Sequence, residues 1–194
     1  MTDMAESADV SSRSSTAWPA PVPAAAMWLP GHALSCYEGD ADRRAWLLTP
    51  GLLTQRIRQV AGDRFAMHVL NEGAQGDEHV REIDMRCGER VWLFAHTRVP
   101  AATIAAHPWL ATIGSRTLGE ALAHRDGLER AEFRYALLGP ESWLIARALS
   151  HAGEAECALW VRHSAFRMSG CPFALYEVFL PSIGQVADSR VAKR

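Results

Sequence analysis

Arg81 and Glu177 are charged residues within segments that otherwise have the pattern of buried strands, and such side chains can together bind and process a small acid. In residues 79–87, alternation places Arg81 on the face that holds Ile83, Met85 and Cys87. In residues 173–181, it places Glu177 on the face that holds Phe173, Leu175 and Phe179. A guanidinium binds a carboxylate through paired hydrogen bonds, and a carboxyl group accepts a hydrogen bond or moves a proton.

Burial imposes a condition on both residues, because an isolated charge inside a protein costs several kcal/mol. Two arrangements satisfy this condition. In the first, Arg81 and Glu177 pair with each other as a structural ion pair. In the second, they line an enclosed site whose ligand supplies a carboxylate for Arg81 and a hydroxyl group or transferable proton for Glu177. The sequence leaves both open, and Glu177 needs either a nearby cation or a bound proton.

The composition indicates one globular domain that does not bind nucleic acid. The chain has 194 residues, 48% of them hydrophobic, which is enough for one domain with a substantial core. A formal charge of −2, with no dense run of basic residues, argues against nucleic acid as a partner. No signal peptide and no apolar run of about 18 residues is present, so we expect a cytoplasmic protein without membrane insertion. The cysteines lack metal-site or disulfide-framework spacing and are expected to be reduced thiols: Cys36, Cys87, Cys157 and Cys171.

The order of the predicted elements favours an α+β fold, with helices around an antiparallel sheet of about six strands. Residues 1–26 are rich in Ser, Ala and Pro and are predicted to be a disordered leader, followed by the domain at 27–185 and a flexible tail at 186–194. Two short helices are predicted within 41–60, separated by the helix breakers of Thr49-Pro50-Gly51, and further helices at 117–124 and 141–151. Strands are predicted at 65–71, 80–87, 91–99, 130–138, 157–168 and 172–180.

Several short segments between Trp46 and Pro181 carry a family resemblance through their order and spacing. They are Leu52-Leu53-Thr54, Val80-Arg81-Glu82-Ile83, the run W-L-F-A-H-T-R-V-P at 92–100, Thr117-Leu118-Gly119, L-W-V-R-H-S at 159–164 before Ser169-Gly170, and E-V-F-L-P at 177–181. No single segment is diagnostic. Together they resemble chorismate lyase, the chorismate–pyruvate lyase of bacterial ubiquinone synthesis.

This resemblance implies one compact domain whose ligand site is sealed beneath helical flaps. It implies that Arg81 holds the ring carboxylate of the ligand, that Glu177 contacts the hydroxyl side of the ring, and that the backbone N–H groups of Leu53 and Leu118 help to bind the carboxylate. The implied reaction removes pyruvate from chorismate and leaves 4-hydroxybenzoate. No metal or organic cofactor is implied, and a small domain with few exposed apolar runs is expected to be a monomer.

The sequence departs from the family pattern at two positions, where histidine replaces arginine. His96 stands in Ala95-His96-Thr97, where the family usually has Ala-Arg-Thr, and His163 stands in Arg162-His163-Ser164, where it usually has Arg-Arg-Ser. Alternation leaves open whether these histidines line the interior site or are structural or peripheral residues. If they line the site, contacts to the departing pyruvyl group are the ones in doubt.

Two other functions are compatible with the same pattern. One is a module that binds a small aromatic acid without chemistry, since the chorismate lyase fold is similar to the effector domains of some bacterial transcription regulators. The N-terminal segment is too short and too poor in apolar residues for a helix-turn-helix, which argues against a complete regulator. The other is a related lyase that makes a different hydroxybenzoate, such as the 3-hydroxy isomer, from chorismate.

Overall fold

The computed structural model describes residues 22–36 and 40–186. Most of the predicted leader and all but the first residue of the predicted tail lie outside these residues. Within the described part of residues 1–26, Val22 and Ala26 pack against an apolar cluster of the domain. No described helix is long and apolar enough to cross a membrane.

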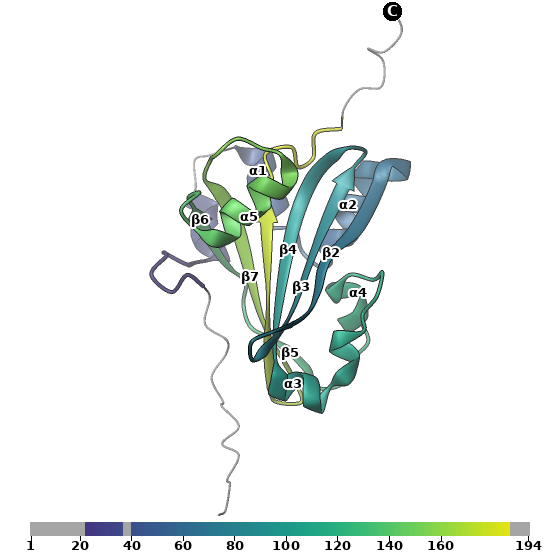
Figure 1. Cartoon of the computed structure of the whole chain (residues 1–194). Coiled ribbons are helices and arrows are strands. Elements are labelled where there is room, and N and C mark those ends of the chain that lie inside the picture. Colours follow the sequence, from purple (N-terminus) through teal and green to yellow (C-terminus); the bar gives the residue numbers. More distant parts are fainter. Residues whose placement is uncertain (1–21, 37–39, 187–194) are drawn as a thin grey trace, which may run out of the picture.

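The strands form one antiparallel sheet of eight strands, which confirms the α+β prediction (Figure 1). The strand order is β1-β6-β7-β8-β4-β3-β2, and the short β5 pairs with β7. The strands are β1 (Leu29–Pro30), β2 (Phe65–Gln75), β3 (Glu78–Cys87), β4 (Arg90–Pro100), β5 (Leu128–Arg130), β6 (Arg134–Leu138), β7 (Leu159–Met168) and β8 (Cys171–Phe179). Alternation along these strands therefore assigns each side chain to one of two faces.

The helices are short and lie between strands or before the sheet. The predicted pair within 41–60 is confirmed, with Pro50 and Gly51 between α1 and α2 and a positive φ of 74° at Gly51. The predicted helices at 117–124 and 141–151 correspond to α4 and α5. The helical segments are η1 (Gly31–Cys36), α1 (Ala41–Leu47), α2 (Leu53–Ala61), η2 (Gly62–Arg64), α3 (Ala101–Ala106), η3 (Pro108–Ala111), α4 (Leu118–Leu122) and α5 (Trp143–Ala152).

The strand predicted at 130–138 is divided into β5 and β6. Between them, the chain has one residue more than the stretch of β7 that it opposes. Arg130 pairs with Phe166, whereas Arg134 pairs with His163, so four steps on one strand oppose three on the other. Such a bulge reverses the alternation. Arg130 and Tyr135 therefore share a face of the sheet although they are an odd number of residues apart.

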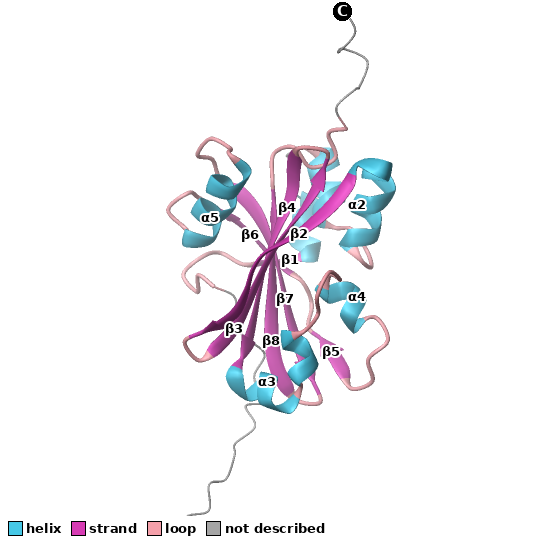
Figure 2. Ribbon diagram, turned by 45° about the vertical axis from the view of Figure 1, so that its right-hand side comes forward, coloured by secondary structure: helices cyan, strands magenta, loops and turns pink. Residues whose placement is uncertain are grey.

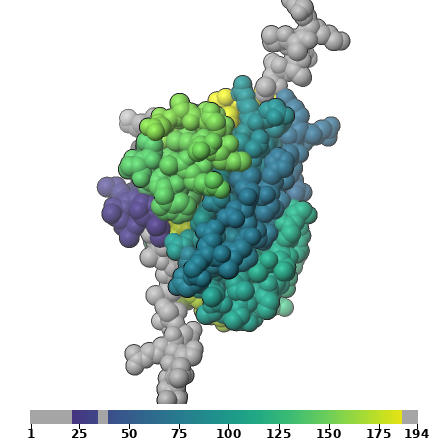
Figure 3. All heavy atoms as spheres, in the orientation of Figure 1, coloured from purple at the N-terminus to yellow at the C-terminus, as the bar shows by residue number. Residues whose placement is uncertain are grey.

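Helices cover both faces of the sheet (Figure 2). On one face, α5 packs its apolar side against residues of β4, β7 and β8. On the other face, α2 packs against residues of β3, β4 and β8, and α4 lies on the same side as α2. In the space-filling view, the β2–β3 hairpin (blue) lies between α5 (green) and the α3–α4 region (teal) (Figure 3). The sheet face beneath α5 and the sheet face beneath α2 and α4 are therefore covered by different helices.

The face beneath α5 holds a buried polar network. His96 and Glu82 lie 3.3 Å apart (Nδ1 to Oε1), and Arg147 of α5 donates to the other oxygen of Glu82 at 2.8 Å. Asp84 is fully buried beside His151 and Arg86, and these partners lower its pKa although burial itself acts in the opposite direction. His96 is thus a paired structural residue on the α5 face.

His163 lies on the same face of the sheet and is buried among aromatic rings. Its ring centroid is 4.8 Å from that of Tyr176 and 5.7 Å from that of Trp28, and its side-chain Nε2 has no hydrogen-bond partner within residues 22–36 and 40–186. Burial lowers its pKa to about 4, because nothing stabilises the charged imidazolium there.

The depressed pKa of His163 predicts a loss of stability at mildly acidic pH. The unfolded chain binds a proton on His163 below about pH 6.5 and the folded chain does not, so the free energy of unfolding is intact above pH 6.5 and falls as the pH drops toward 4. The contribution is on the order of 3 kcal/mol. In urea titrations, His163→Leu should lose less stability between pH 6.5 and pH 4 than the wild type. The exposed His124→Gln is the control, and parallel losses in wild type and His163→Leu would refute the assignment.

Candidate active site

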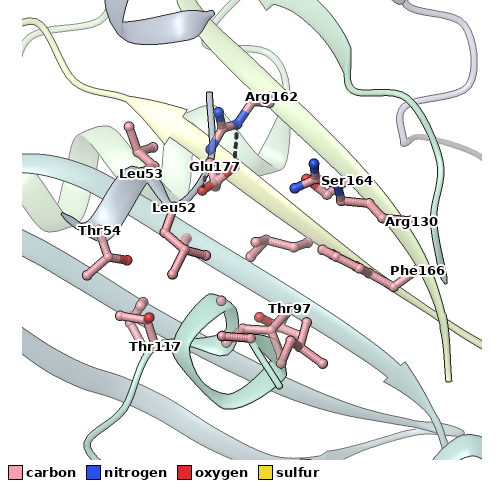
Figure 4. A pocket seen from close by; sticks show the side chains of 18 of the residues that line it. Leu52, Leu53, Thr54, Thr97, Thr117, Arg130, Arg162, Ser164, Phe166 and Glu177 are labelled. Carbon is pink, nitrogen blue, oxygen red and sulfur yellow. Dashed lines mark hydrogen bonds and ion pairs between the residues drawn. The ribbon is translucent and has the colours of Figure 1, made fainter. Parts of the chain in front are cut away.

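A cavity of about 340 Å³ lies on the sheet face opposite α5, beneath α2 and α4 (Figure 4). All four residues singled out by the sequence line it: Leu53, Arg81, Leu118 and Glu177. Arg81 and Glu177 lie on the predicted faces of their strands, since Ile83, Met85 and Leu175 line the same wall. His96 and His163 do not line it, because they project from the other side of the sheet.

Arg81 is 2% exposed and is held to the protein along one edge of its guanidinium. Its Nη2 donates to the carbonyl oxygens of Gly114 and Arg116 at 2.6 and 3.0 Å. Its Nε lies 3.2 Å from Oε1 of Glu72, an ion-pair distance, although the N–H is not aligned for a hydrogen bond. Burial lowers the pKa of Arg81 and Glu72 counteracts this, so the group stays charged at neutral pH. Its Nη1 has no protein partner among the described residues.

Glu177 is 6% exposed and is paired with Arg162 of β7, which is 2% exposed. Nε and Nη2 of Arg162 donate to the two oxygens of Glu177 at 2.6 and 3.0 Å, and Nη1 reaches the carbonyl oxygen of Thr49 at 3.4 Å. The cation that Glu177 needs is therefore Arg162. A structural pair between Arg81 and Glu177 is excluded, since each has a different partner.

The two helices over the cavity begin at the two leucines named above. α2 starts at Leu53 without a side-chain cap. α4 starts at Leu118, and Thr117 and Glu120 form a capping box in which the Thr117 hydroxyl accepts from the N–H of Glu120. The N–H groups of the first helical turn have no acceptor within a helix. Both helices therefore present N–H groups next to the cavity.

The loop before α2 and the start of α4 also touch each other. A methyl group added at Gly119 would lie 2.8 Å from Cδ2 of Leu52, so the absence of a side chain at Gly119 allows this close approach. Arg58 of α2 forms an ion pair with Glu120 of α4 at 3.1 Å. We refer to the segments 50–61 and 117–122 as the two lids.

Comparison with known proteins agrees with this geometry. The family model described as chorismate lyase matches residues 74–188. A protein of Thiobacillus denitrificans named "Probable chorismate pyruvate-lyase" is 33% identical in an alignment of 172 positions, which covers 80% of this chain and 89% of the relative. A protein of Bordetella pertussis with the same name is 32% identical in an alignment of 192 positions, which covers 90% of this chain and 98% of the relative. This chain belongs to the chorismate lyase family. Its relatives carry the name of a carbon–oxygen lyase, and the chain is an enzyme of that class.

A solved structure was also matched. The ligand-binding domain of a GntR-family transcriptional regulator from Bordetella bronchiseptica aligns with a TM-score of 0.40 and 10% identity, over 62% of this chain and 88% of that domain. That score is too low to support an inference about fold or function, so the chorismate lyase assignment depends on the family model and the sequence relatives.

Sequence reasoning missed three charged residues of this chorismate lyase family member. Arg162 follows Trp160 and precedes Ser164 and Phe166 on one face of an apolar strand, so the count that found Arg81 also applies to it. Glu72 lies just after the strand predicted at 65–71. β2 continues past a register shift, however, and pairs Glu72 with Arg81 of the neighbouring strand. Arg130 also lines the cavity, from the separate strand β5 that the bulge creates.

Removing one partner of the Arg162–Glu177 pair should be far more harmful than removing both. Arg162→Met leaves a carboxylate buried without its cation, which is expected to lower the free energy of unfolding by about 3–5 kcal/mol. The double variant Arg162→Met with Glu177→Leu removes both charges and should recover most of that loss. Urea unfolding of the three proteins at pH 7 measures the difference. Equal stability of the single and double variants would contradict the pairing.

Proposed function

We propose that this protein removes pyruvate from chorismate to give 4-hydroxybenzoate, the first committed step of ubiquinone biosynthesis. The observation that carries the proposal is that Arg81, a buried guanidinium with a free edge, and Glu177, a buried carboxylate with a separate partner, line one cavity of about 340 Å³ in a chain of the chorismate lyase family. Relatives that match most of the chain bear the name chorismate pyruvate-lyase.

The reaction asks little of the protein besides positioning. Chorismate carries a ring carboxylate, a hydroxyl group on the carbon opposite it, and an enolpyruvyl ether on the neighbouring carbon. The ether bond between the ring carbon and oxygen breaks, and the hydrogen on the hydroxyl-bearing carbon moves to the methylene carbon of the enolpyruvyl group. The products are 4-hydroxybenzoate and pyruvate, so atoms and electrons balance without a further reactant. Aromatisation of the ring provides the driving force.

Arg81 is the proposed partner of the ring carboxylate. With Nη2 bound to two carbonyl oxygens, the guanidinium offers Nη1 to the ligand. The first N–H groups of the two lids, at Leu53 and Leu118, supply donors for the remaining lone pairs, and an anion at a helix N-terminus is favoured electrostatically. The side chains of the same leucines cover the ring.

Glu177 is the proposed partner of the ring hydroxyl group. β4 lies between β3 and β8, so Arg81 and Glu177 project from strands separated by two strand spacings, about 10 Å. A flat ring fits between them, with its carboxylate toward Arg81 and its hydroxyl toward Glu177. A carboxylate that already accepts two hydrogen bonds from Arg162 acts as a further acceptor, which holds the hydroxyl group and the adjacent ether in place.

Product chromatography and two substitutions test the proposal. Incubation with chorismate should yield 4-hydroxybenzoate and pyruvate in equal amounts; the 3-hydroxy isomer would identify a different synthase, and binding of 4-hydroxybenzoate without turnover would identify a binding module. Arg81→Ala should weaken 4-hydroxybenzoate binding by at least about 100-fold in calorimetry, because a charged hydrogen-bond partner is lost. Wild-type affinity in that variant would rule out the assigned role, and the exposed Arg90→Ala is the control.

Glu177→Gln should affect turnover more than binding. It keeps the shape of the side chain but removes the negative charge that holds Arg162 and accepts from the ring hydroxyl group, so kcat is expected to fall by about 100-fold. Affinity for 4-hydroxybenzoate should change less than about tenfold. A variant with unchanged kcat and weaker product binding would show that Glu177 acts only in binding.

Slow product release, gated by the lids, is expected because an apolar cavity beneath two lids retains the aromatic product. Gly119→Ala places a methyl group against Leu52 and therefore disfavours the closed arrangement of the lids. The dissociation rate of 4-hydroxybenzoate should rise severalfold in stopped-flow measurements. Adding Leu52→Val removes the opposing methyl group and should restore the slow rate, with Leu52→Val alone as reference. A burst of product in wild type that persists unchanged in Gly119→Ala would argue against gating by this contact.

A further inference from the structure

The cavity contains a third arginine, Arg130, whose side chain faces the cavity from the far end of the sheet. Its strand β5 pairs with β7 so that Arg130 lies opposite Phe166, on the same face as Ser164 and Arg162. Its guanidinium carbon lies 4.4 Å from the ring centroid of Phe133, and that of Arg162 lies at the same distance from the same ring. Arg130 is thus close to the Arg162–Glu177 pair (Figure 4), whereas Arg81 is on β3 at the opposite side of the cavity.

The three arginines of the cavity differ in how their charges are balanced. Arg81 lies beside Glu72, and Arg162 is held by Glu177. Arg130 has neither an acidic partner nor a hydrogen-bond acceptor among the described residues, and its contact is the face of Phe133. Its residue is exposed, so its charge is hydrated at the mouth of the cavity. Besides Arg81 with its open Nη1, Arg130 is therefore the cavity arginine whose donors are available to an anion.

The proposed substrate has a second carboxylate for which no protein partner has yet been assigned. It belongs to the enolpyruvyl group, whose ether oxygen is on the ring carbon next to the hydroxyl-bearing carbon. With the ring carboxylate at Arg81 and the hydroxyl group at Glu177, the ether is at the Glu177 end of the cavity, where Arg162 and Arg130 also line the wall. Arg162 is engaged by Glu177, by the carbonyl oxygen of Thr49 and by Tyr135, and its charge is balanced by Glu177. Arg130 is left to bind it.

We propose that Arg130 binds the carboxylate of the departing pyruvyl group and so distinguishes the dianionic substrate from the monoanionic aromatic product; this assignment rests on the proposed function. A planar guanidinium suits a carboxylate geometrically, and its attraction acts on chorismate but not on 4-hydroxybenzoate, which has lost that group. Pyruvate keeps the carboxylate. Arg130 lies at the exposed mouth of the cavity. Pyruvate therefore leaves through this mouth, while 4-hydroxybenzoate stays beneath the lids.

The test compares a ligand that has both carboxylates with one that has a single carboxylate. The stable probe 3-(carboxymethoxy)-4-hydroxybenzoate carries its second carboxylate where the pyruvyl carboxylate of chorismate would be. Arg130→Met should weaken its binding by about 10- to 100-fold in calorimetry, while the affinity for 4-hydroxybenzoate stays within about twofold of the wild type. In steady-state assays, KM for chorismate should rise by a similar factor. Arg130→Lys, which keeps the charge without the planar fork, should recover part of the loss.

Arg134→Met is the matched control, since it removes the same charge four residues away. Arg134 is exposed and pairs with His163, on the face of the sheet away from the cavity. Arg134→Met should leave the affinities for the dicarboxylate probe and for 4-hydroxybenzoate unchanged, and KM for chorismate as well.

The proposal is overturned if the wild type does not bind the dicarboxylate probe, or if Arg130→Met weakens both ligands equally or neither of them. These outcomes are separable from failure of the proposed function. If the wild type forms no pyruvate from chorismate and Arg130→Met still weakens only the dicarboxylate probe, the lyase activity is refuted and the second carboxylate site stands. If the wild type forms pyruvate and Arg130→Met does not selectively weaken the dicarboxylate probe, the lyase activity stands and the second carboxylate site is refuted.

Discussion

A buried charge on the apolar wall of a cavity must be balanced by a partner at a fixed position, and the site depends on that requirement. Glu177 remains a carboxylate acceptor because Arg162 holds both of its oxygens. Arg81 keeps one edge free because Glu72 and two backbone carbonyl groups occupy the other. The partners come from neighbouring strands, β7 beside β8 and β2 beside β3. The strand order of the sheet therefore determines which edges of the charged groups remain open to a ligand.

The sequence predicted what depends on local pattern. Alternation placed Arg81 and Glu177 on the cavity wall, and the breakers at Pro50 and Gly51 divided the first lid from α1. The fold class followed from the order of the elements. The partners of the two charged residues were not predicted, because pairing depends on which strands become neighbours. Arg162 contacts Glu177 only because β7 and β8 are adjacent in the sheet, and Glu72 reaches Arg81 only because β2 extends past an apparent turn.

The sheet separates two polar environments that the sequence pattern did not distinguish. His96 and His163, the two departures from the family pattern, both lie on the α5 face, where one is paired with Glu82 and the other is surrounded by aromatic rings. The face that carries Arg81, Glu177 and the lids is shielded from them by the backbone of the sheet. Substitutions at these two positions therefore leave the residues that line the cavity unchanged.

The bulge between β5 and β6 has a consequence for how this segment can vary in length. In an uninterrupted strand, position 133 would pair with His163 and its side chain would turn toward the α5 face. The extra residue releases Phe133 from the ladder and lets its ring contact the guanidinium groups of both Arg130 and Arg162. The aromatic ring is thus a cation–π partner shared by two like charges. Loss of a single codon here would remove that shared partner while leaving the flanking strand pairs intact, so insertions and deletions should be poorly tolerated at this one connection.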